Sequence, residues 1–199
     1  MKGLCLLSSG IDSPVAAYLL HENNLALEFI HMFVDESSCE IASSLRDLID
    51  GGIPLHVVSV LDMHEAITGN TQNRFHCVLC KRMFYRLACR LAFGVDAQVL
   101  VTGESIGQVA SQTLDNLCVL DDASDLPVLR PLIGMDKNEI IDVSRAAGLY
   151  EASIADQSPC PFVPRKPATQ ARLNHIRKQE DKLDVEKIVE DCLFSRREI

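Results

Sequence analysis

The sequence lacks long hydrophobic runs, internal repeats and low-complexity segments. No apolar stretch comes near the roughly 18 residues that a membrane-spanning helix needs, so we expect no membrane partner. The polar segment Ser8–Ser13 interrupts the apolar start of the chain too early for a signal peptide. With 199 residues, 47% of them hydrophobic, the chain is long enough for one well-buried domain and too short for two large ones. These features predict a soluble, cytoplasmic, globular protein.

An excess of positive charge is also absent, since the formal net charge is −9. An acidic body argues against direct binding of the chain to nucleic acid. The charge is uneven, however: residues 165–199 hold nine Lys and Arg against seven Asp and Glu, and five basic residues lie between Arg74 and Arg90. Basic side chains are thus concentrated in two segments of an otherwise acidic chain.

Four apolar runs alternate with helical patterns in the first half of the chain. The runs are rich in β-branched or aromatic residues and too continuous for half-exposed strands, so buried parallel strands with helical crossovers explain them best. The predicted strands are 3–7, 25–34, 54–60 and 97–102, and the predicted helices are 14–23, 38–50, 62–69 and 78–93. The fold class is therefore α/β, a doubly wound, mostly parallel sheet with helices on both faces. Ligands of such sheets bind beyond the carboxyl ends of the strands.

The second half of the chain is predicted to hold further helices. We expect helices over about 106–117 and 137–147, and an amphipathic helix from about 181 to 194. We divide the chain into a domain at 1–164 and a helical tail at 165–199. The tail is predicted to pack on the domain or on a second subunit.

The loop between the first predicted strand and the first predicted helix is suited to an anion. The strand ends at the hexapeptide SSGIDS, and the helix opens at Pro14 with Ser13 as its expected N-cap. The free N–H groups of the loop and of the first helical turn, together with the helix dipole, favour a negative ligand. The loop lacks the Lys of the G-x-x-x-x-G-K-[ST] nucleotide loop, and it is no G-x-G-x-x-G dinucleotide loop either.

The hexapeptide instead matches S-x-G-x-D-S, the pyrophosphate-binding loop (PP-loop) of ATP pyrophosphatases. Its surroundings, LSSGIDSPVAAY, resemble the ThiI family, which makes 4-thiouridine in tRNA and is linked to thiamine biosynthesis. The resemblance implies an adenine nucleotide alpha hydrolase-like fold that cleaves ATP to AMP and pyrophosphate. It also implies that the phosphates are held by five loop residues, namely Ser8, Ser9, Gly10, Asp12 and Ser13. Asp12 would lie near Mg²⁺. Most members carry Gly at the position of Ser9; if that position needs a positive φ, Ser9 is strained and ATP binding is weakened.

Eight cysteines without a secretion signal predict free thiols, a metal site or catalysis. Cys77 and Cys80 form a C-x-x-C at the start of the predicted 78–93 helix, whose N-terminus favours thiolates. This spacing by itself leaves zinc, redox and iron–sulfur roles open, although no second C-x-x-C completes a zinc site and a thioredoxin-like motif belongs to a different fold. His76 is better interpreted as a polar neighbour than as a ligand. The other five cysteines are predicted to be buried packing thiols: Cys5, Cys39, Cys89, Cys118 and Cys192.

Cys160, in DQSPCPFVPRKPAT, resembles the cysteine that handles persulfide sulfur in bacterial members of the family. Members with an additional C-x-x-C, chiefly archaeal, imply an iron–sulfur cluster (4Fe-4S or 3Fe-4S) held here by Cys77, Cys80 and Cys160. Three ligands leave one iron open, and an open iron can bind and deliver sulfide. The resemblance therefore makes Cys160 and Asp12 the predicted catalytic residues.

The segment LVTGESIGQVASQT (100–113) resembles the family most closely of all. Gly103 follows a buried strand, where a backbone without a side chain lets adenine approach. A polar face follows it, with helix capping or surface exposure as the alternative for each member: Glu104, Ser105, Gln108, Ser111 and Gln112. His31 stands where relatives contact adenine through backbone atoms, although a core histidine is the slightly better interpretation. The predicted ATP contacts thus include His31, Gly103 and Gln112, and Arg130 is expected to pair with a phosphate, a carboxylate or a surface acid.

Arg82, Arg86 and Arg90 fall at i, i+4 and i+8, on one stripe of the predicted 78–93 helix. With Arg74 and Lys81 they predict a basic edge that suits an RNA backbone or the phosphates of ATP. A solvated helix face is the alternative for Arg86 and Arg90.

The resemblance covers about residues 3–169 and implies an ATP-dependent sulfurtransferase that adenylates a carbonyl oxygen, first of all in a tRNA uridine, and replaces it with sulfur. Family members carry an RNA-binding, THUMP-containing region ahead of this domain, whereas Met1 lies two residues before the first predicted strand. We therefore expect tRNA to be brought by a separate RNA-binding partner, sulfur by a sulfide or persulfide donor, and, by family likeness, a homodimer. The alternatives are thiolation of a small molecule, a nucleotide-sensing module, and a metal or sulfur carrier that has lost ATP.

Overall fold

The computed structural model describes residues 1–107, 112–155 and 160–199. In these ranges the chain folds around a six-stranded sheet with the order β5-β4-β1-β2-β3-β6. The strands are β1 (Lys2–Leu6), β2 (Ala26–Phe33), β3 (Leu55–Ser59), β4 (Val99–Val101), β5 (Val128–Leu129) and β6 (Arg197–Glu198). All neighbours pair in parallel except β3 and β6, which pair antiparallel. The predicted doubly wound, mostly parallel α/β sheet is confirmed.

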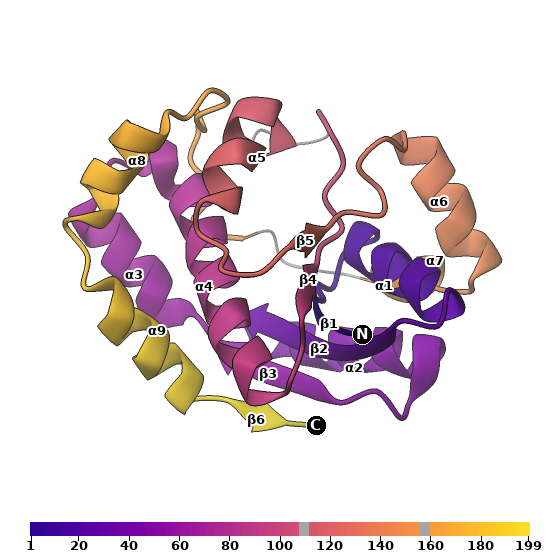
Figure 1. Ribbon diagram of the computed structural model, residues 1–199. Coiled ribbons are helices and arrows are strands. Elements are labelled where there is room, and N and C mark those ends of the chain that lie inside the picture. Colours follow the sequence, from indigo (N-terminus) through magenta and orange to yellow (C-terminus); the bar gives the residue numbers. More distant parts are fainter. Residues whose placement is uncertain (108–111, 156–159) are drawn as a thin grey trace.

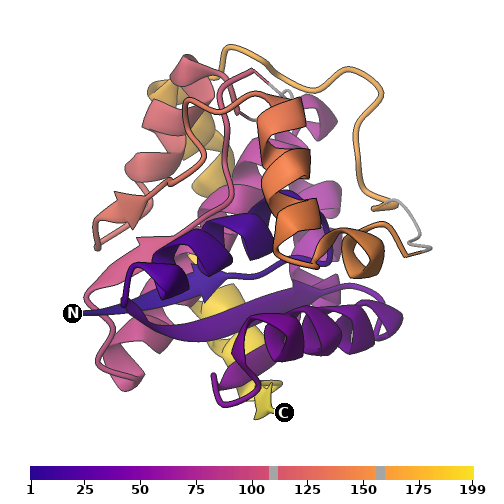
Figure 2. The same ribbon diagram turned by 90° about the vertical axis from the view of Figure 1, so that its right-hand side faces the viewer.

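Helices cover both faces of the sheet (Figure 1). They are α1 (Asp12–Glu22), α2 (Ser37–Asp50), α3 (Leu61–Asn70), α4 (His76–Gly94), α5 (Leu114–Asp121), α6 (Lys137–Ala146), α7 (Tyr150–Ser153), α8 (Leu173–Glu180) and α9 (Val185–Phe194), with a 3-10 turn at Asn73–Phe75. Figure 2 shows α1, α2, α6 and α7 together on the face turned toward the viewer. The opposite face is covered by α3, α4 and α9. No helix in the described ranges is both long enough and apolar enough to cross a membrane.

The sheet separates two hydrophobic cores because successive side chains of a strand point to opposite faces. Leu4 of β1 belongs to the core under α3, α4 and α9, and the next residue, Cys5, belongs to the core under α1, α2 and α6. Cys5 stands in register between Phe29 of β2 and Val101 of β4, which share its core. Strands that are buried on both sides explain why the apolar runs in the sequence are continuous.

The strand order places a topological switch point between β1 and β4. From β1 the chain moves outward through β2 to β3, and α4 then carries it back to β4 on the other side of β1. The loops after β1 and β4 therefore diverge at the carboxyl edge of the sheet, where open α/β sheets bind their ligands.

Two helical predictions differ from the structure. The helix expected over 106–117 is found at Leu114–Asp121, where the side chain of Thr113 caps it by accepting a hydrogen bond from the N–H of Asn116; residues 108–111 lie outside the described ranges. The tail holds two helices, α8 and α9, because a turn follows Glu180 and Asp184 caps a new helix through the N–H of Lys187. After α9 the chain adds β6 to the sheet edge.

Candidate functional site

The loop after β1 is closed by its own two outer serines. The N–H of Ser8 donates to Oγ of Ser13 over 2.7 Å, and the two hydroxyl oxygens lie 2.9 Å apart. Because this hydroxyl is bonded back to the loop, Ser13 is not the N-cap, and the prediction was wrong: α1 begins at Asp12. Pro14 still lies in the first turn, where its missing N–H costs no helical hydrogen bond.

The serine that departs from the family pattern is unstrained. Among the described residues other than glycine, positive φ occurs at Asn24 and Asp96, and Ser9 is not one of them. Gly10 also has no positive φ. The position of Ser9 therefore does not demand glycine, and backbone strain gives no reason for weak ATP binding.

Gly103 lies directly against the start of α1. A Cβ atom at this position would lie 2.4 Å from the backbone nitrogen of Ser13 and 2.5 Å from the carbonyl carbon of Asp12. These contacts are with backbone atoms that cannot move aside cheaply. The glycine is thus required because the loop after β1 packs on the end of β4, a reason that the sequence did not reveal.

A cavity of about 220 Å³ opens between this loop and α4. Its lining comes from β1, the loop, α4 and the segment after β4: Leu6, Ser8, Asp12, Ser13, Lys81, Phe84, Tyr85, Thr102, Gly103, Glu104 and Gln112. Oε1 of Gln112 is buried and has no hydrogen-bond partner in the described part of the chain. A buried acceptor of this kind is costly unless a ligand supplies a donor.

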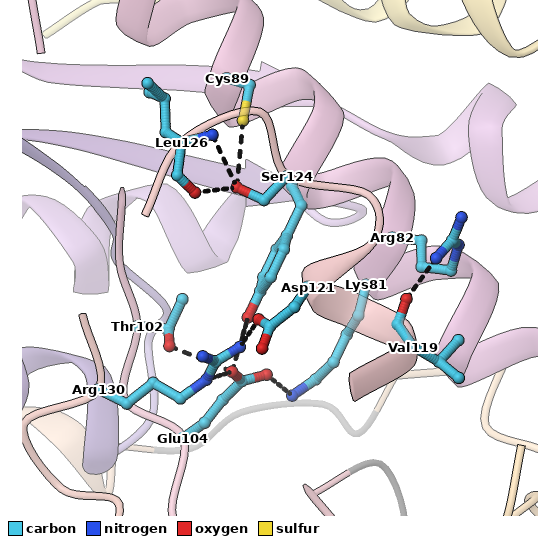
Figure 3. A network of polar contacts seen from close by, with 11 residues as sticks. Lys81, Arg82, Cys89, Thr102, Glu104, Val119, Asp121, Ser124, Leu126 and Arg130 are labelled. Atoms are coloured by element: carbon cyan, nitrogen blue, oxygen red, sulfur yellow. Dashed lines mark hydrogen bonds and ion pairs between the residues drawn. The ribbon is translucent and has the colours of Figure 1, made fainter. Parts of the chain in front are cut away.

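Glu104 is the centre of a buried charge network beside the cavity (Figure 3). Its carboxylate accepts hydrogen bonds from Lys81 Nζ at 3.1 Å, Tyr85 OH at 2.6 Å and Arg130 Nε at 2.9 Å. Arg130 also pairs with Asp121. Burial alone raises the pKa of Glu104, but the charge of Lys81 and the hydrogen bonds of the other partners hold that pKa below its ordinary value. Burial and the negative charge of Glu104 raise the pKa of Tyr85.

Lys137 is a site residue that the sequence reasoning did not single out. Its Nζ lies 2.5 Å from Oδ1 of Asp12, which places a cation at the loop. It is the first residue of α6, whose start is fixed by a capping box between Asp136 and Glu139. The sequence placed Lys137 at the start of the helix expected over 137–147, but that pattern did not mark it as a site residue.

Of the three cysteines expected to hold a cluster, Cys160 lies near enough to affect the two thiols of α4. Cys77 is half-buried, Cys80 is buried, and Cys160 is exposed. Burial, followed by the charge of Cys160, raises the pKa of both Cys77 and Cys80. Desolvation therefore outweighs the helix N-terminus that was expected to favour thiolates. Among the described residues no three His, Cys, Asp or Glu side chains are assembled closely enough to hold a metal ion.

Two buried histidines lie beside these thiols, and sequence reasoning did not identify His64 at all. Nε2 of His64 is 3.7 Å from Sγ of Cys80, and its Nδ1 is 2.8 Å from Nε2 of His76. Burial lowers the pKa of His64 to about 4 and also lowers that of His76, so both rings are neutral at pH 7. His64 lies on the α3 helix, where no sequence motif marked it.

The other cysteines follow the prediction with one exception. Cys5, Cys39, Cys89 and Cys192 are buried, whereas Cys118 is exposed. The prediction was wrong for Cys118 because α5 turns its residue 118 away from α4, although its neighbours Leu117 and Val119 are buried.

The predicted basic edge is largely neutralised inside the protein. Arg82 is 1% exposed, and its guanidinium bonds to Glu180 at 2.8 and 2.9 Å. Arg86 pairs with the same carboxylate, and Arg90 pairs with Glu186 of α9. The stripe of arginines thus faces the C-terminal helices, because their acidic side chains meet it there. Arg82 is corrected from an exposed edge residue to a buried structural one.

Three further predicted residues are placed as follows. Arg74 is exposed and lies over the ring of Phe75, with 4.9 Å to the ring centre. His31 is buried, with its ring nitrogens at Leu7 O and Ser38 Oγ, and burial lowers its pKa. The hydroxyl of Ser105 donates to Met135 O. Gln108 and Ser111 lie outside the described residues.

Comparisons with known proteins point to one family. A family profile described as "Thiamine biosynthesis protein (ThiI)" matches residues 1–185. A probable tRNA sulfurtransferase of Finegoldia magna is 37% identical over 96% of this chain and 51% of its own length, and one of Methanocaldococcus jannaschii is 34% identical over 92% and 50%. The chain spans about half the length of the curated relatives it matches.

Solved structures show the same likeness. A crystal structure of a 4-thiouridine synthetase–RNA complex with bound ATP matches with a TM-score of 0.95 at 31% identity, covering 100% of this chain and 54% of that one. NMN synthetase from Francisella tularensis matches with a TM-score of 0.62 at 16% identity, covering 97% and 82%, which is a likeness of fold.

Proposed function

The chain belongs to the ThiI family, and from this premise we propose that it is an ATP-dependent sulfurtransferase domain whose acceptor is a tRNA uridine. The observation that carries the proposal lies on α4. Cys80 belongs to the three interacting thiols, and the next residue, Lys81, lines the cavity beside the PP-loop. One helix thus joins the cavity beside an anion-binding loop to a group of thiols, as a reaction that activates with ATP and then delivers sulfur requires. The solved relative that binds both RNA and ATP supports the same assignment.

ATP would occupy the cavity with its phosphates on the loop after β1. The N–H groups of the first turn of α1 lack helical acceptors and suit a phosphate, and Lys137 adds a positive charge. Within the loop, the N–H groups of Ser8 and Gly10 are bonded to the hydroxyls of Ser13 and Ser8 in the described structure. Gln112 offers its unpartnered Oε1 to a donor of the nucleotide, and Gly103 lets the loop sit close. A contact at His31 would involve its backbone, since its ring nitrogens are already bonded.

The residues at the loop also fit Mg²⁺. This ion is usually held by one or two carboxylates together with substrate phosphates, and Asp12 supplies one carboxylate at the cavity. When bound, Mg²⁺ neutralises negative charge on the phosphates. Lys137, which pairs with Asp12 here, is then free to contact a phosphate itself.

In the proposed reaction the carbonyl oxygen of the acceptor attacks the α-phosphorus of ATP, and the bond to the β-phosphate breaks. The N–H groups of the first turn of α1 and Lys137 stabilise the charge of the departing pyrophosphate. Sulfur then attacks the activated carbon, and AMP leaves with the original oxygen. The second step needs thiols close to the place where ATP activates the acceptor, and α4 carries Cys77 and Cys80 near the cavity.

For the sulfur step we propose an iron–sulfur site held by Cys77, Cys80 and Cys160, supplied by a sulfide or persulfide donor. Thiolates are the usual ligands of such clusters, so the donor types fit; the three side chains must move together to share a cluster, because the described structure does not assemble them as a metal site. A cluster with three protein ligands supplies an iron that is open to sulfide. Anaerobic purification with iron and sulfide analysis tests this proposal, and a colourless protein that holds zinc or no metal would contradict it.

Recognition of tRNA is proposed to depend on a separate RNA-binding partner. The chain carries a net charge of −9, and the arginines of α4 pair with acids of the C-terminal helices. The arginines of α4 are therefore not free to contact an RNA backbone, and the exposed basic residues of the described ranges lie mainly in the segment 165–199. The homodimer and the cytoplasm remain expectations from the resemblance and the sequence.

The decisive experiment follows both products under anaerobic conditions with ATP, unmodified tRNA and sulfide. We expect AMP and 4-thiouridine from the parent chain when the RNA-binding partner is present. Cys160→Ala should abolish thiolation while ATP affinity stays within about twofold, because Cys160 does not line the cavity. The control Cys118→Ala removes another exposed thiol and should leave both unchanged.

Each other outcome changes the proposal in a definite way. Loss of ATP binding in Cys160→Ala would make that cysteine structural. Formation of AMP only with a small thiol-accepting molecule would replace tRNA as the acceptor. No AMP with any acceptor would leave a nucleotide-sensing or carrier role.

A further inference from the structure

Three flat side chains stack beside the thiols. The ring of Phe162 lies 4.5 Å from the ring centre of His64 at an angle of 8°, and 5.6 Å from that of His76 at 7°. The two histidine rings are parallel within 11° and are joined by the hydrogen bond between Nδ1 and Nε2. Parallel rings at these distances attract one another beyond the apolar area that they bury. The stack therefore acts as one packed unit.

Each ring of this stack is tied to a different cysteine. His64 reaches Cys80 through the 3.7 Å contact between Nε2 and Sγ. His76 opens α4 and directly precedes Cys77. Phe162 follows Cys160 by two residues. The stack thus joins the C-x-x-C helix to the chain segment that carries the third thiol.

Phe162 turns inward, as does Pro164 two residues later. Phe162 is half-buried, whereas Pro161 and Val163 on either side are exposed. Cys160 itself is exposed, yet its charge influences both thiols of α4. The ring contacts of Phe162 lie two residues from this cysteine, nearer to it than the hydrogen bond from Ala168 N–H to Arg74 O (2.9 Å), which also joins the segment to the start of α4.

We propose that Phe162 is a positioning residue, which by stacking on His64 and His76 holds Cys160 beside Cys77 and Cys80. The proposal rests on the proposed function only for the statement that these thiols handle sulfur. The positioning itself is a property of the apoprotein, and it can be measured without ATP, tRNA, iron or sulfide.

The test measures the effective concentration of the Cys160 thiol at Cys77. The Cys80→Ser and Cys118→Ser substitutions remove the competing thiols, and the reduced apoprotein is equilibrated with a glutathione buffer. Two protein thiols and one oxidised glutathione give one protein disulfide and two reduced glutathione molecules, so the equilibrium ratio yields the effective concentration. Peptide mapping identifies the disulfide.

Four variants in this background separate stacking from general packing. Phe162→Ala should lower the effective concentration about tenfold, and Phe162→Leu, which keeps apolar volume without a ring, about threefold. Phe162→Tyr should keep the parent value. Val163→Ala, the exposed neighbour, is the matched control and should also keep it.

An unchanged value in folded Phe162→Ala overturns the proposal. If circular dichroism shows that this variant does not fold, Phe162→Leu decides in the same way. Sulfur transfer by the parent chain is measured separately. If the parent chain transfers no sulfur but the Phe162 variants lower the effective concentration, only the proposed function is contradicted. If the parent chain transfers sulfur but the variants leave the effective concentration unchanged, only the positioning role is contradicted.

Discussion

At the scale of single residues, the candidate site depends on close packing at Gly103 and on the buried charge of Glu104. Gly103 leaves no space for a methyl group against the backbone of Asp12 and Ser13. Glu104 is buried with two cationic partners, Lys81 and Arg130, and two hydroxyl donors, Tyr85 and Thr102, so removing its charge leaves the two cations unbalanced. Gly103 is half-buried and Glu104 is buried, and both line the cavity.

We predict that Gly103→Ala destabilises the fold by about 2 kcal/mol and weakens ATP binding at least about tenfold, because the loop must move away from β4. Urea unfolding and calorimetric titration with ATP measure the two effects. Gly69→Ala is the control, since a Cβ there meets no atom within 4 Å. Equal stability of the two variants would show that the loop shifts at no cost.

We predict that Glu104→Gln costs about 3 kcal/mol at pH 7, because Lys81 and Arg130 lose their shared counter-charge. The pKa of Glu104 is lowered from 4.5 in the folded protein, so the unfolded chain binds more protons between the two values. Its contribution to stability is therefore complete above about pH 4.5 and is lost as the pH falls through the folded pKa.

Urea unfolding at a series of pH values from 7 down to about 3 measures this effect. The slope of unfolding free energy against pH should be shallower in Glu104→Gln than in the parent. Glu65→Gln, at an exposed position, should retain the parent slope. A parent-like slope in Glu104→Gln would mean that its carboxylate is not stabilised by the network.

At the scale of elements, α4 connects nearly every part of the protein. Its start carries the C-x-x-C, its middle lines the cavity, and its arginine stripe meets α8 and α9. Burial raises the pKa of Glu180 when considered alone, but hydrogen bonds from Arg82 and Arg86 lower it, so this carboxylate is charged inside the protein. Helix α8 is therefore fixed to α4 by buried ion pairs, whereas the pair between Arg90 and Glu186 of α9 is exposed.

We predict that Arg82→Met destabilises the protein by about 3 kcal/mol, because it leaves Glu180 and Asp122 short of a buried partner. Amide exchange should accelerate first in α8. Arg90→Met removes an exposed pair with Glu186 and should cost under about 1 kcal/mol. If Arg82→Met instead leaves stability intact and weakens RNA binding, the arginine belongs to a binding edge after all.

At the scale of the whole molecule, charge decides what the chain can bind alone. Its 28 acidic residues exceed its 19 basic ones, and several of the basic residues are used internally. Phosphate contacts provide most of the affinity of proteins for nucleic acids. The fold thus presents a candidate nucleotide site on a body of net negative charge, whose exposed basic residues lie mainly in the segment 165–199.

We predict that the chain alone binds tRNA with a Kd no tighter than about 10⁻⁵ M at physiological salt, with a weak salt dependence. Filter binding over a salt series measures both quantities. Addition of the RNA-binding partner should tighten binding and steepen the salt dependence. Nanomolar binding by the chain alone would contradict the need for a partner.

Much of this protein follows from local sequence. Continuous apolar runs predicted the parallel sheet, since strands buried on both faces need no polar side. The SSGIDS loop behind β1 predicted the anion site, because a strand, a short loop and a helix suffice to present free N–H groups. Boundaries were less certain: Ser13 and Thr113 changed them by side-chain hydrogen bonds that spacing does not encode.

Tertiary structure alone decided which groups meet. The sequence placed Gly103, Lys137 and Asp12 far apart, and the switch point between β1 and β4 brought them to one loop. The sequence predicted the arginine stripe of α4 to be a basic edge, whereas in the structure Glu180 of the C-terminal helix α8 pairs with Arg82 and Arg86. Short segments of sequence determine which chemical groups stand next to one another along the chain. The burial of a side chain and its hydrogen-bond or ion-pair partners depend on contacts between distant segments, which only the packed fold determines.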